Sequence, residues 1–315
     1  MLNITVKLVR YTEDAPRLVA LASKTSLSKK PLRELLEIGD DEVEVWIRET
    51  FKRQHFSPWE HASYTFAVDG LSRVASHQLV RHRVASYTQM SHRYTEGYLR
   101  NLALEASRIA GHDCPEKPKG NKREVYKCYS DAVMVAGGLV TNASELAKLA
   151  STAFVPPLQF LNREDLLEAW ADSVLVTASD YYRLLSKGAL REDARYVLAD
   201  SVRTRIVVTM NARELVQVFL PLRMCTKAQW EIRHIAWALW GELVKVHPQL
   251  FKWVGPSCVF RENTSRKEPA ELRRYVDGEE GFTIPRCPEL VENKAIPGCL
   301  RAAARPPHRD PGDPA

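Results

Sequence analysis

The sequence lacks any apolar run near the ~18 residues that a membrane-spanning helix needs. It also lacks a signal-peptide pattern, because its first residues, MLNITVKLVR, are typical of an edge strand. No CxxC pair occurs among the six scattered cysteines, which are Cys114, Cys128, Cys225, Cys258, Cys287 and Cys299. This scatter argues against a structural zinc site and against a disulfide scaffold. We therefore predict a cytoplasmic protein with free thiols and no membrane association.

Several motifs of nucleotide binding and hydrolysis are missing as well. Neither GxGxxG nor GxxxxGK[ST] occurs, so a Rossmann or P-loop mode has no support. HExxH and GxSxG are also absent. A phosphate or dinucleotide would have to be held by side chains, and arginine matches that task through its planar, bidentate guanidinium.

The composition fits a globular protein with a local anion site. The 315 residues are 45% hydrophobic, enough for one large domain or two ordinary ones. Lys and Arg number 45 and Asp and Glu 39, a formal net charge of +6. Because acidic residues nearly balance basic ones, a focused anion site fits better than a general polyanion-binding surface.

Hydrophobic periodicity predicts strands interspersed with long helices, an α+β architecture with a mixed sheet. The predicted strands are 4–9, 61–68 (ended by a turn at Gly70) and 203–210. The predicted helices are 14–23, one within 40–56, one from its N-cap Ser72 to about 81, 123–151, 163–187, one from its N-cap Asn211 to about 220, and one within 227–247. We predict a catalytic domain over 1–250 and a C-terminal extension over 251–315. Its last ~12 residues, rich in proline, are expected to be disordered.

The stretch RHRVASYTQMSHRY, residues 81–94, crowds basic side chains where a helix ends. Like charges repel, so an anionic partner would explain the cluster. A solvated basic helix end and a patch for nucleic acid are the two alternatives. Arg223 is the other notable arginine, because it follows the apolar run 220–222, where an unpaired guanidinium would be costly. An internal ion pair with Glu214 or Glu231 explains it equally well.

The segment HFSPWEH, residues 55–61, places two histidines and a glutamate around a proline turn. Such a set could bind a metal ion. The strand alternation that follows would send His55 and His61 to different sides, so we expect no metal site.

Taken together, these motifs resemble the flavin-dependent thymidylate synthases. The stretch at 81–94 is similar to that family's Arg-His-Arg and Ser-x-Arg-Tyr signature, and HFSPWEH to its upstream element. NAREL at 211–215 and LRMCTKAQWE at 222–231 look like its downstream elements. The resemblance covers roughly residues 1–245, in the family's order.

This resemblance implies FAD-dependent methylation at C5 of a uridine monophosphate, converting dUMP to dTMP. It also implies NADPH as reductant, 5,10-methylenetetrahydrofolate as carbon donor, and a homotetramer. The implied FAD contacts are Ser26, Ser57, Arg81, His82, Arg83, Gln89, Asn211, Arg213 and Gln217. The implied nucleotide contacts are Gln78, Gln89, Met90, Ser91, His92, Arg93, Arg195 and Arg223. Arg223 would favour ionisation at N3 of the pyrimidine, and His55 would lie beside flavin and folate. No cysteine nucleophile is needed.

The chain also departs from the family pattern. Thr88-Gln89 stands where the family often has Asn-Glu, Gln217 where it has Asn, and Lys227 where it has His. There is an extra residue between Asn211 and Arg223, longer helical material over about 115–190, and a tail of ~70 residues without a recognisable counterpart. Whether Gln217 and Lys227 contact ligands is left open.

Two alternatives to dUMP methylation therefore remain. The first is the same chemistry on the ribonucleotide UMP, as in relatives that make peptidyl nucleoside antibiotics. The second, from another class, is a basic RNA-binding module, although we expect no nucleic acid polymer as a partner.

Overall fold

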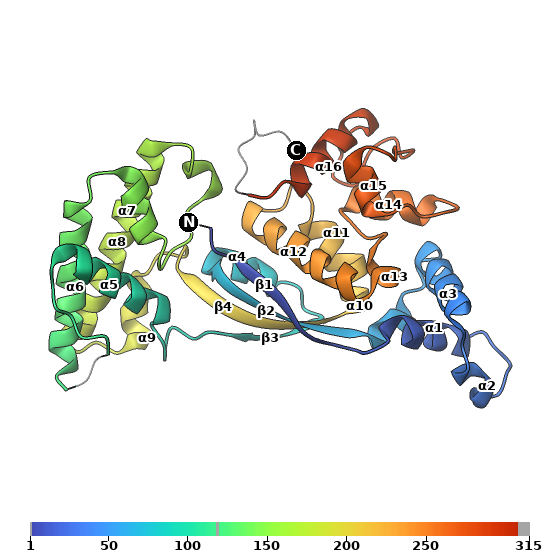
Figure 1. Ribbon diagram of the computed structural model, residues 1–315, viewed down its shortest axis with the longest axis horizontal. Helices are drawn as coiled ribbons and strands as arrows, with labels where there is room; N and C mark the ends of the chain where they lie inside the picture. Colours follow the sequence, from blue (N-terminus) through green and yellow to red (C-terminus); the bar gives the residue numbers. More distant parts are fainter. Residues whose placement is uncertain (1, 118–119, 308–315) are drawn as a thin grey trace. The chain divides into compact units, whose positions relative to one another are not determined.

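The computed structural model describes residues 2–117 and 120–307 (Figure 1). These residues form two compact units, and each unit is discontinuous in sequence. Unit 1 comprises Met1–Ile4, Asp69–His77 and Gln89–Ile206, and unit 2 comprises Thr5–Val68, Gln78–Thr88 and Val207–Ala315. Helices and one sheet are interspersed along the chain, which confirms the predicted α+β class.

The sheet has four strands in the order β1-β2-β4-β3. Their bounds are β1 Thr5–Tyr11, β2 Ser63–Ser72, β3 Ala85–Gln89 and β4 Arg203–Asn211. The sheet is antiparallel, so the predicted mixed sheet was wrong. Strand β3 was not predicted, because its short polar sequence, ASYTQ, has no apolar alternation.

Strand β2 also corrects the predicted turn at Gly70, because it continues through Gly70 to Ser72. Gly70 has φ +79°, and a Cβ at this position would lie only 2.3 Å from the carbonyl oxygen of Asn3. Glycine is therefore needed for a close backbone approach within the strand rather than for a turn. Ser72 does act as an N-cap, since its hydroxyl accepts a hydrogen bond from the backbone N–H of Ala75 at 3.0 Å.

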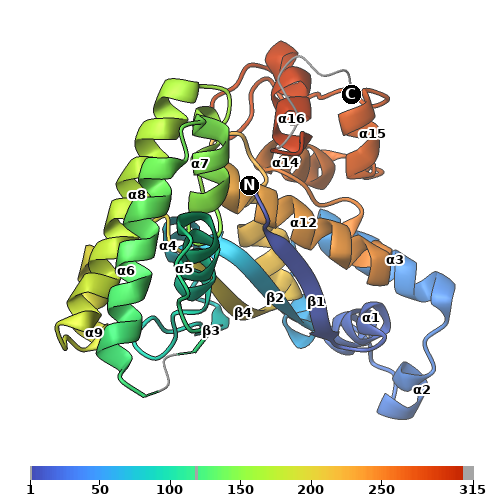
Figure 2. The ribbon, with the colours of Figure 1, turned by 60° about the vertical axis from the view of Figure 1, so that its left-hand side comes forward.

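Unit 1 is built around a helical core (Figure 2). Its helices are α5 Gly97–Ala110, α6 Lys122–Leu139, α7 Ala143–Ala150, α8 Glu164–Ser186 and α9 Arg191–Ala194. The prediction for 163–187 is confirmed by α8, whereas 123–151 is two helices. The break falls at Asn142, whose side chain caps α7 by accepting from the Glu145 N–H.

A disulfide in unit 1 corrects the prediction that all the cysteines are free. Cys114, in the loop after α5, is bonded to Cys128 of α6, with the two Cα atoms 5.8 Å apart. The pairing could not be predicted from the sequence, because packing of α5 against α6, rather than a CxxC spacing, brings the two residues together. His112 lies beside the two sulfurs.

Unit 2 contains most of the sheet and the remaining helices. They are α1 Ala15–Thr25, α2 Leu32–Leu36, α3 Asp40–Lys52, the 3-10 turn η1 Ser57–His61, α10 Ala212–Glu214, η4 Leu215–Phe219, α11 Leu220–Arg223, α12 Trp230–Val246 and α13 Pro248–Phe251. Helix α4 (Arg73–Leu79) begins in unit 1 and ends in unit 2. The predicted helices at 14–23, 40–56 and 227–247 are confirmed as α1, α3 and α12.

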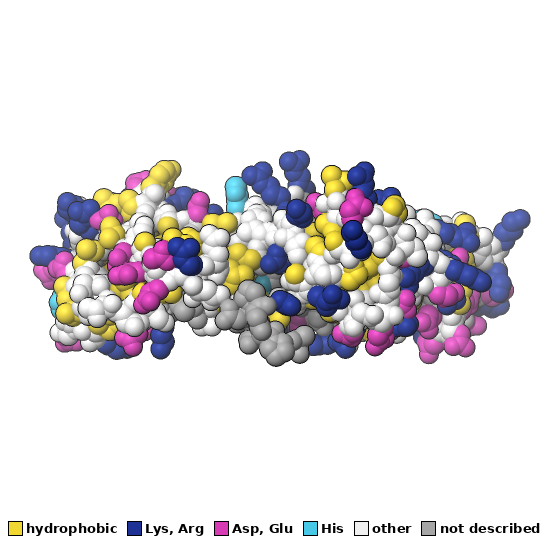
Figure 3. Space-filling model, turned by 90° about the horizontal axis from the view of Figure 1, so that it is seen from above, with side chains coloured by type: hydrophobic (Ala, Val, Ile, Leu, Met, Phe, Trp, Pro, Cys, Tyr) yellow, Lys and Arg dark blue, Asp and Glu magenta, His cyan; other side chains and the backbone are white. Residues whose placement is uncertain are grey.

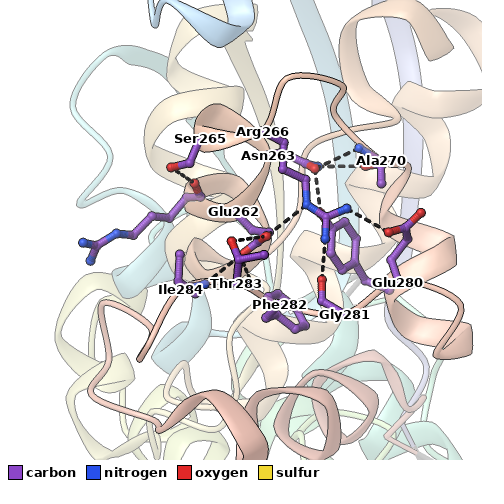
Figure 4. Close-up of polar contacts among 12 residues, drawn as sticks. Glu262, Asn263, Ser265, Arg266, Ala270, Glu280, Gly281, Phe282, Thr283 and Ile284 are labelled. Carbon is purple, nitrogen blue, oxygen red and sulfur yellow. Dashed lines mark hydrogen bonds and ion pairs between the residues drawn. The ribbon is translucent and has the colours of Figure 1, made fainter.

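The C-terminal segment is ordered as far as it is described, in α14 Ser257–Ser265, α15 Leu272–Asp277, η5 Asn293–Ala295 and α16 Ile296–Ala304. Hydrogen bonds to the fully buried Glu262 connect several parts of this segment (Figure 4). The Glu262 carboxylate accepts hydrogen bonds from Thr283, from the Ile284 N–H and from Arg266, at 2.8 to 3.1 Å. These bonds satisfy a charge that would otherwise be costly to bury. Most of the predicted disordered end, 308–315, lies outside the described residues.

Among the helices described, none is both long and apolar enough to cross a membrane.

Candidate active site

The basic turn at 81–83 connects α4 to β3 in unit 2. The Tyr87 hydroxyl holds this turn, because it lies 2.9 Å from the Leu79 carbonyl oxygen and 2.8 Å from that of His82. The turn directs the His82 ring inward, where the residue is only 5% exposed, and leaves Arg81 and Arg83 on the surface. Within residues 2–117 and 120–307, neither guanidinium has a hydrogen bond or an ion pair. Two uncompensated cations therefore flank a buried histidine.

His82 lies between a cation and a carboxylate. Arg223 Nε donates to His82 Nε2 at 2.9 Å, and His82 Nδ1 lies 3.2 Å from Glu214 Oε1. Arg223 Nη2 also reaches the Gln78 carbonyl oxygen at 3.5 Å. The predicted alternative was an ion pair of Arg223 with Glu214 or Glu231. Among the described residues Arg223 makes neither ion pair, and His82 instead joins it to Glu214.

These contacts define the protonation of His82. Because Arg223 donates to Nε2, that nitrogen must accept, and the single ring proton lies on Nδ1, facing Glu214. Burial, helped by the charge on Arg223, lowers the pKa of His82 to about 4, so the ring is neutral at pH 7. Burial raises the pKa of Glu214 and lowers that of Arg223, since each charge is partly removed from water.

The helical run from α10 through η4 to α11 positions both ends of this chain. Asn211 caps it, its Oδ1 accepting from the Glu214 N–H at 2.8 Å, as predicted. The middle of the run, Leu215–Phe219, is a π-helix, which accommodates one more residue per turn than an α-helix would. Such a turn can accommodate the extra residue expected between Asn211 and Arg223. Pro221 follows it, and its carbonyl oxygen accepts from the Ser257 hydroxyl at 2.9 Å.

A second group of implied FAD contacts lies at α10 and η1, also in unit 2. Arg213 Nε donates to Gln217 Oε1 at 2.8 Å, and Arg213 Nη1 is paired with Glu60. Ser57 is exposed at the start of η1, and His55, just before it, is half-buried. His55, Glu60 and His61 do not gather as a three-ligand metal cluster in the described chain. Ser26 is exposed just after α1, where its hydroxyl donates to the Ser23 carbonyl oxygen at 2.8 Å.

The implied nucleotide contacts from 89 to 93, together with Arg195, belong to unit 1. His92 is 8% exposed, and neither of its ring nitrogens has a hydrogen-bond partner among the residues the structure describes. Burial, together with the nearby Arg73 and Arg195, lowers the pKa of His92 to about 4. A neutral, unsatisfied histidine beside two cations is the arrangement expected of a ligand pocket.

The neighbours of His92 are tied to the protein. Arg93 forms an ion pair with Glu192 at 2.6 Å, and Arg195 Nε donates to the Glu192 carbonyl oxygen at 3.1 Å. Gln89 Nε2 donates to Ser76 Oγ at 2.8 Å and also lies 3.2 Å from Thr204 Oγ1. The Met90 N–H bonds the Arg205 carbonyl oxygen at 2.8 Å, and Ser91 Oγ accepts from the Arg93 N–H.

The structure thus separates the implied residues into two sets. Unit 2 holds Gln78, Arg223, His55 and every implied FAD contact except Gln89, and unit 1 holds Gln89, Met90, Ser91, His92, Arg93 and Arg195. Sequence reasoning missed Arg73 and Tyr87 and considered Glu214 only as an ion-pair partner. The glutamate of NAREL, three residues after the cap Asn211, was the available signal for Glu214.

Comparison with known proteins identifies the family. The model of the thymidylate synthase complementing protein family matches residues 7–249. The flavin-dependent thymidylate synthase of Aeropyrum pernix is 63% identical over 306 residues, covering 96% of this chain and 94% of that protein. That of Sulfolobus acidocaldarius is 40% identical over 302 residues, covering 95% and 94%. The chain is therefore an enzyme, and it belongs to the flavin-dependent thymidylate synthase family.

A solved structure agrees with this assignment. The flavin-dependent thymidylate synthase of Helicobacter pylori, complexed with FAD and dUMP, is 26% identical, with a TM-score of 0.55. The match covers 79% of this chain and 99% of that one. Because 306 residues align with the Aeropyrum protein, that match extends well past residue 249. The tail therefore has a counterpart in the Aeropyrum protein, although the family model itself ends at residue 249.

Proposed function

We propose that this chain methylates dUMP at C5 to give dTMP, with FAD as cofactor, NADPH as reductant and 5,10-methylenetetrahydrofolate as carbon donor. The main observation in support is the Arg223–His82–Glu214 chain. In it, the hydrogen bond from Arg223 Nε to His82 holds one side of the guanidinium in a fixed orientation. Arg223 Nη1 has no hydrogen-bond partner among the described residues. It is therefore available to a substrate.

Arg223 would act on the pyrimidine through its charge. A guanidinium beside N3 stabilises the deprotonated ring, and the added electron density makes C5 more nucleophilic. His82 and Glu214 act as positioning residues, because they fix the plane of the guanidinium without needing to touch the substrate. Because His82 is neutral, and no carboxylate among the described residues forms an ion pair with Arg223, the charge of Arg223 is not compensated by a direct contact.

The residues present fit FAD. Arg81 and Arg83 are exposed cations without partners in the described chain, and Arg213 is exposed at the next helical run, so the three could hold a diphosphate. We propose Ser26, Ser57, His82, Gln89, Asn211 and Gln217 as further contacts, with His55 beside flavin and folate. Reduced FAD supplies the hydride when bound, NADPH reduces it, and the folate provides the carbon.

The residues of unit 1 fit a nucleotide. His92 lacks hydrogen-bond partners among the described residues and lies near Arg73 and Arg195, so a phosphate or ribose hydroxyl could satisfy its ring. We propose Gln89, Met90, Ser91 and Arg93 as further nucleotide contacts in unit 1, and Gln78 as one in unit 2. The assembly of sites from several subunits of a homotetramer, the cytoplasmic location and the division at residue 250 remain predictions.

The test is a side-by-side assay of the purified protein with dUMP and with UMP, supplying FAD, NADPH and methylenetetrahydrofolate and following product by mass spectrometry. We expect a strong preference for dUMP, since the relatives above are named thymidylate synthases. Equal or faster methylation of UMP would overturn the substrate assignment. An RNA-binding module would instead bind polyanions with steep salt dependence and carry no flavin.

The face of the protein shown in Figure 3 does not favour the RNA-binding alternative. Over much of the face shown in Figure 3, acidic and basic side chains are interspersed. A polyanion-binding surface would be expected to gather one sign of charge.

A further inference from the structure

The four cysteines outside the disulfide line one small pocket in unit 2. They come from four separate places: Cys225 follows α11, Cys258 lies in α14, Cys287 lies in the loop between α15 and η5, and Cys299 lies in α16. The space between the lining side chains is about 20 Å³, roughly the room that one water molecule occupies. The four thiols, from residues far apart in the sequence, therefore lie where the C-terminal segment packs against the residues that follow Arg223.

The surroundings divide the four thiols into two pairs. Thr226 Oγ1 lies 3.0 Å from Cys299 Sγ, so Cys299 is next to the residue that follows Cys225. Burial raises the pKa of Cys225, and the Cys299 thiol adds to that rise. Cys258 packs against the small buried cluster that contains Cys287. Burial raises the pKa of Cys258 to about 12, and Cys287 is the foremost of the thiols that add to it.

This arrangement does not suit a metal ion. A tetrahedral thiolate site needs its sulfurs gathered around one centre. In the described chain, only His112, Cys114 and Cys128 bring three potential ligand atoms within 4.8 Å of one another, and the four pocket cysteines do not. Two separate pairs, by contrast, suit two disulfides, which carry no charge and lose nothing by burial.

Such bonds would increase the stability of the C-terminal segment. Its own buried apolar cluster consists of Ile284, Cys287 and Ile296, and cores of this size are commonly reinforced by disulfides or metals. The same chain already carries the Cys114–Cys128 disulfide, so disulfides are compatible with its structure.

We propose that Cys225 with Cys299, and Cys258 with Cys287, are oxidisable pairs that form disulfides by exchange with a small-molecule or protein disulfide. In each exchange the S–S bond of the donor breaks and one forms between the two cysteines. Two electrons and two protons pass to the donor, which leaves as two thiols. The Cys225–Cys299 bond joins α16 to the segment that carries Arg223, and the Cys258–Cys287 bond closes the extension on itself.

The first test is peptide mapping of the full-length protein after incubation with oxidised glutathione. Free thiols are alkylated in denaturant without reductant, and linked peptides are identified by mass spectrometry. We expect linked peptides for Cys225–Cys299 and Cys258–Cys287, beside Cys114–Cys128, and no stoichiometric metal by elemental analysis. Alkylation of all four pocket cysteines, a different pairing, or one bound metal ion per chain would each overturn the proposal.

The variant Cys299→Ser distinguishes the effect of the Cys225–Cys299 disulfide from the effect of the Cys299 side chain on packing. Cys299→Ser should leave Cys225 free for alkylation while the Cys258–Cys287 peptide persists. The long loop closed by Cys225–Cys299 should make the oxidised wild type melt roughly 5–10 °C above the oxidised variant. With reductant present, the two proteins should melt within about 2 °C of each other. An equal difference under both conditions would show a packing effect only and contradict the proposed bond. Neither measurement depends on the proposed methylation.

Discussion

Two buried histidines of the same 14-residue stretch, one in each unit, lie in opposite environments. In unit 2, His82 is bonded on both ring nitrogens, to Arg223 and to Glu214. In unit 1, His92 is bonded on neither by any residue the structure describes. Burial lowers the pKa of both to about 4. We infer from this contrast that His82 orients Arg223, the catalytic group proposed above, and that His92 is available to bind a ligand.

The largest effect on activity should come from substitution of Arg223, which His82 orients. Arg223→Ala should lower kcat by about 10²–10³-fold, because it removes a charge directed at the reacting ring. Flavin content should stay near that of the wild type, since Arg81 and Arg83 remain. Arg223→Lys is the matched control: it keeps the charge but cannot donate through Nε to His82, so we expect intermediate activity. Methylation rates and flavin absorbance provide both readouts, and an unchanged rate in Arg223→Ala would remove Arg223 from the mechanism.

The two histidines can be compared directly by His82→Ala and His92→Ala. Both remove the same ring, but only the first leaves a buried carboxylate and a half-buried guanidinium without their partner. We expect His82→Ala to lower the free energy of unfolding by about 2 kcal/mol more than His92→Ala does. Urea denaturation measures the difference. In dUMP binding the order should reverse, with His92→Ala the more damaging. Equal stability of the two variants would argue against the scaffold role of His82.

The exposed arginines on either side of His82 should matter for flavin rather than for stability. Arg81→Ala and Arg83→Ala should each weaken FAD binding by about 10-fold, the loss expected for one charge-assisted contact. The control is Arg163→Ala, an exposed arginine paired with Asp165 in unit 1, which should bind FAD as the wild type does. Fluorescence titration with FAD measures all three. Wild-type affinity in both Arg81→Ala and Arg83→Ala would contradict the proposed cofactor site.

The smallest effect concerns pH. Each histidine has a folded pKa near 4, below its usual 6.5, so between these values the unfolded chain binds a proton that the folded one does not. Stability should therefore fall as pH is lowered from about 6.5 to 4, by about 1–3 kcal/mol per histidine. An anionic nucleotide should raise the pKa of His92 and leave that of His82 unchanged. NMR titration with and without dUMP tests this, and equal shifts at both rings would contradict the contrast.

Much of the local structure was predictable because it is encoded locally. The alternation in residues 61–68 marks β2, and the caps Ser72 and Asn211 mark helix starts. The Arg-His-Arg run points to the candidate site. Features that depend on distant partners were not predictable. Gly70 was expected to end a strand, but it allows the Asn3 carbonyl to approach closely. Cys114 and Cys128 meet only because α5 packs on α6.

The same limit applies to the site. Apart from the family resemblance, which assigns them different ligands, His82 and His92 are equivalent members of one basic cluster in the sequence. Their difference arises because Glu214 and Arg223, more than 130 residues away, pack against one of them and not the other. The extension was likewise beyond prediction, since it depends on Glu262 binding Thr283 and Ile284 across a loop.

The role proposed for Arg223 in flavin-dependent methylation of dUMP is tested most directly by comparing the wild-type and Arg223→Ala proteins. Each protein is first quantified for bound flavin and then assayed for conversion of dUMP to dTMP with NADPH and methylenetetrahydrofolate. We expect both proteins to be yellow and only the wild type to form dTMP at an appreciable rate. A wild-type protein that binds no flavin and forms no dTMP, or an Arg223→Ala protein that matches the wild type, would contradict the proposed role.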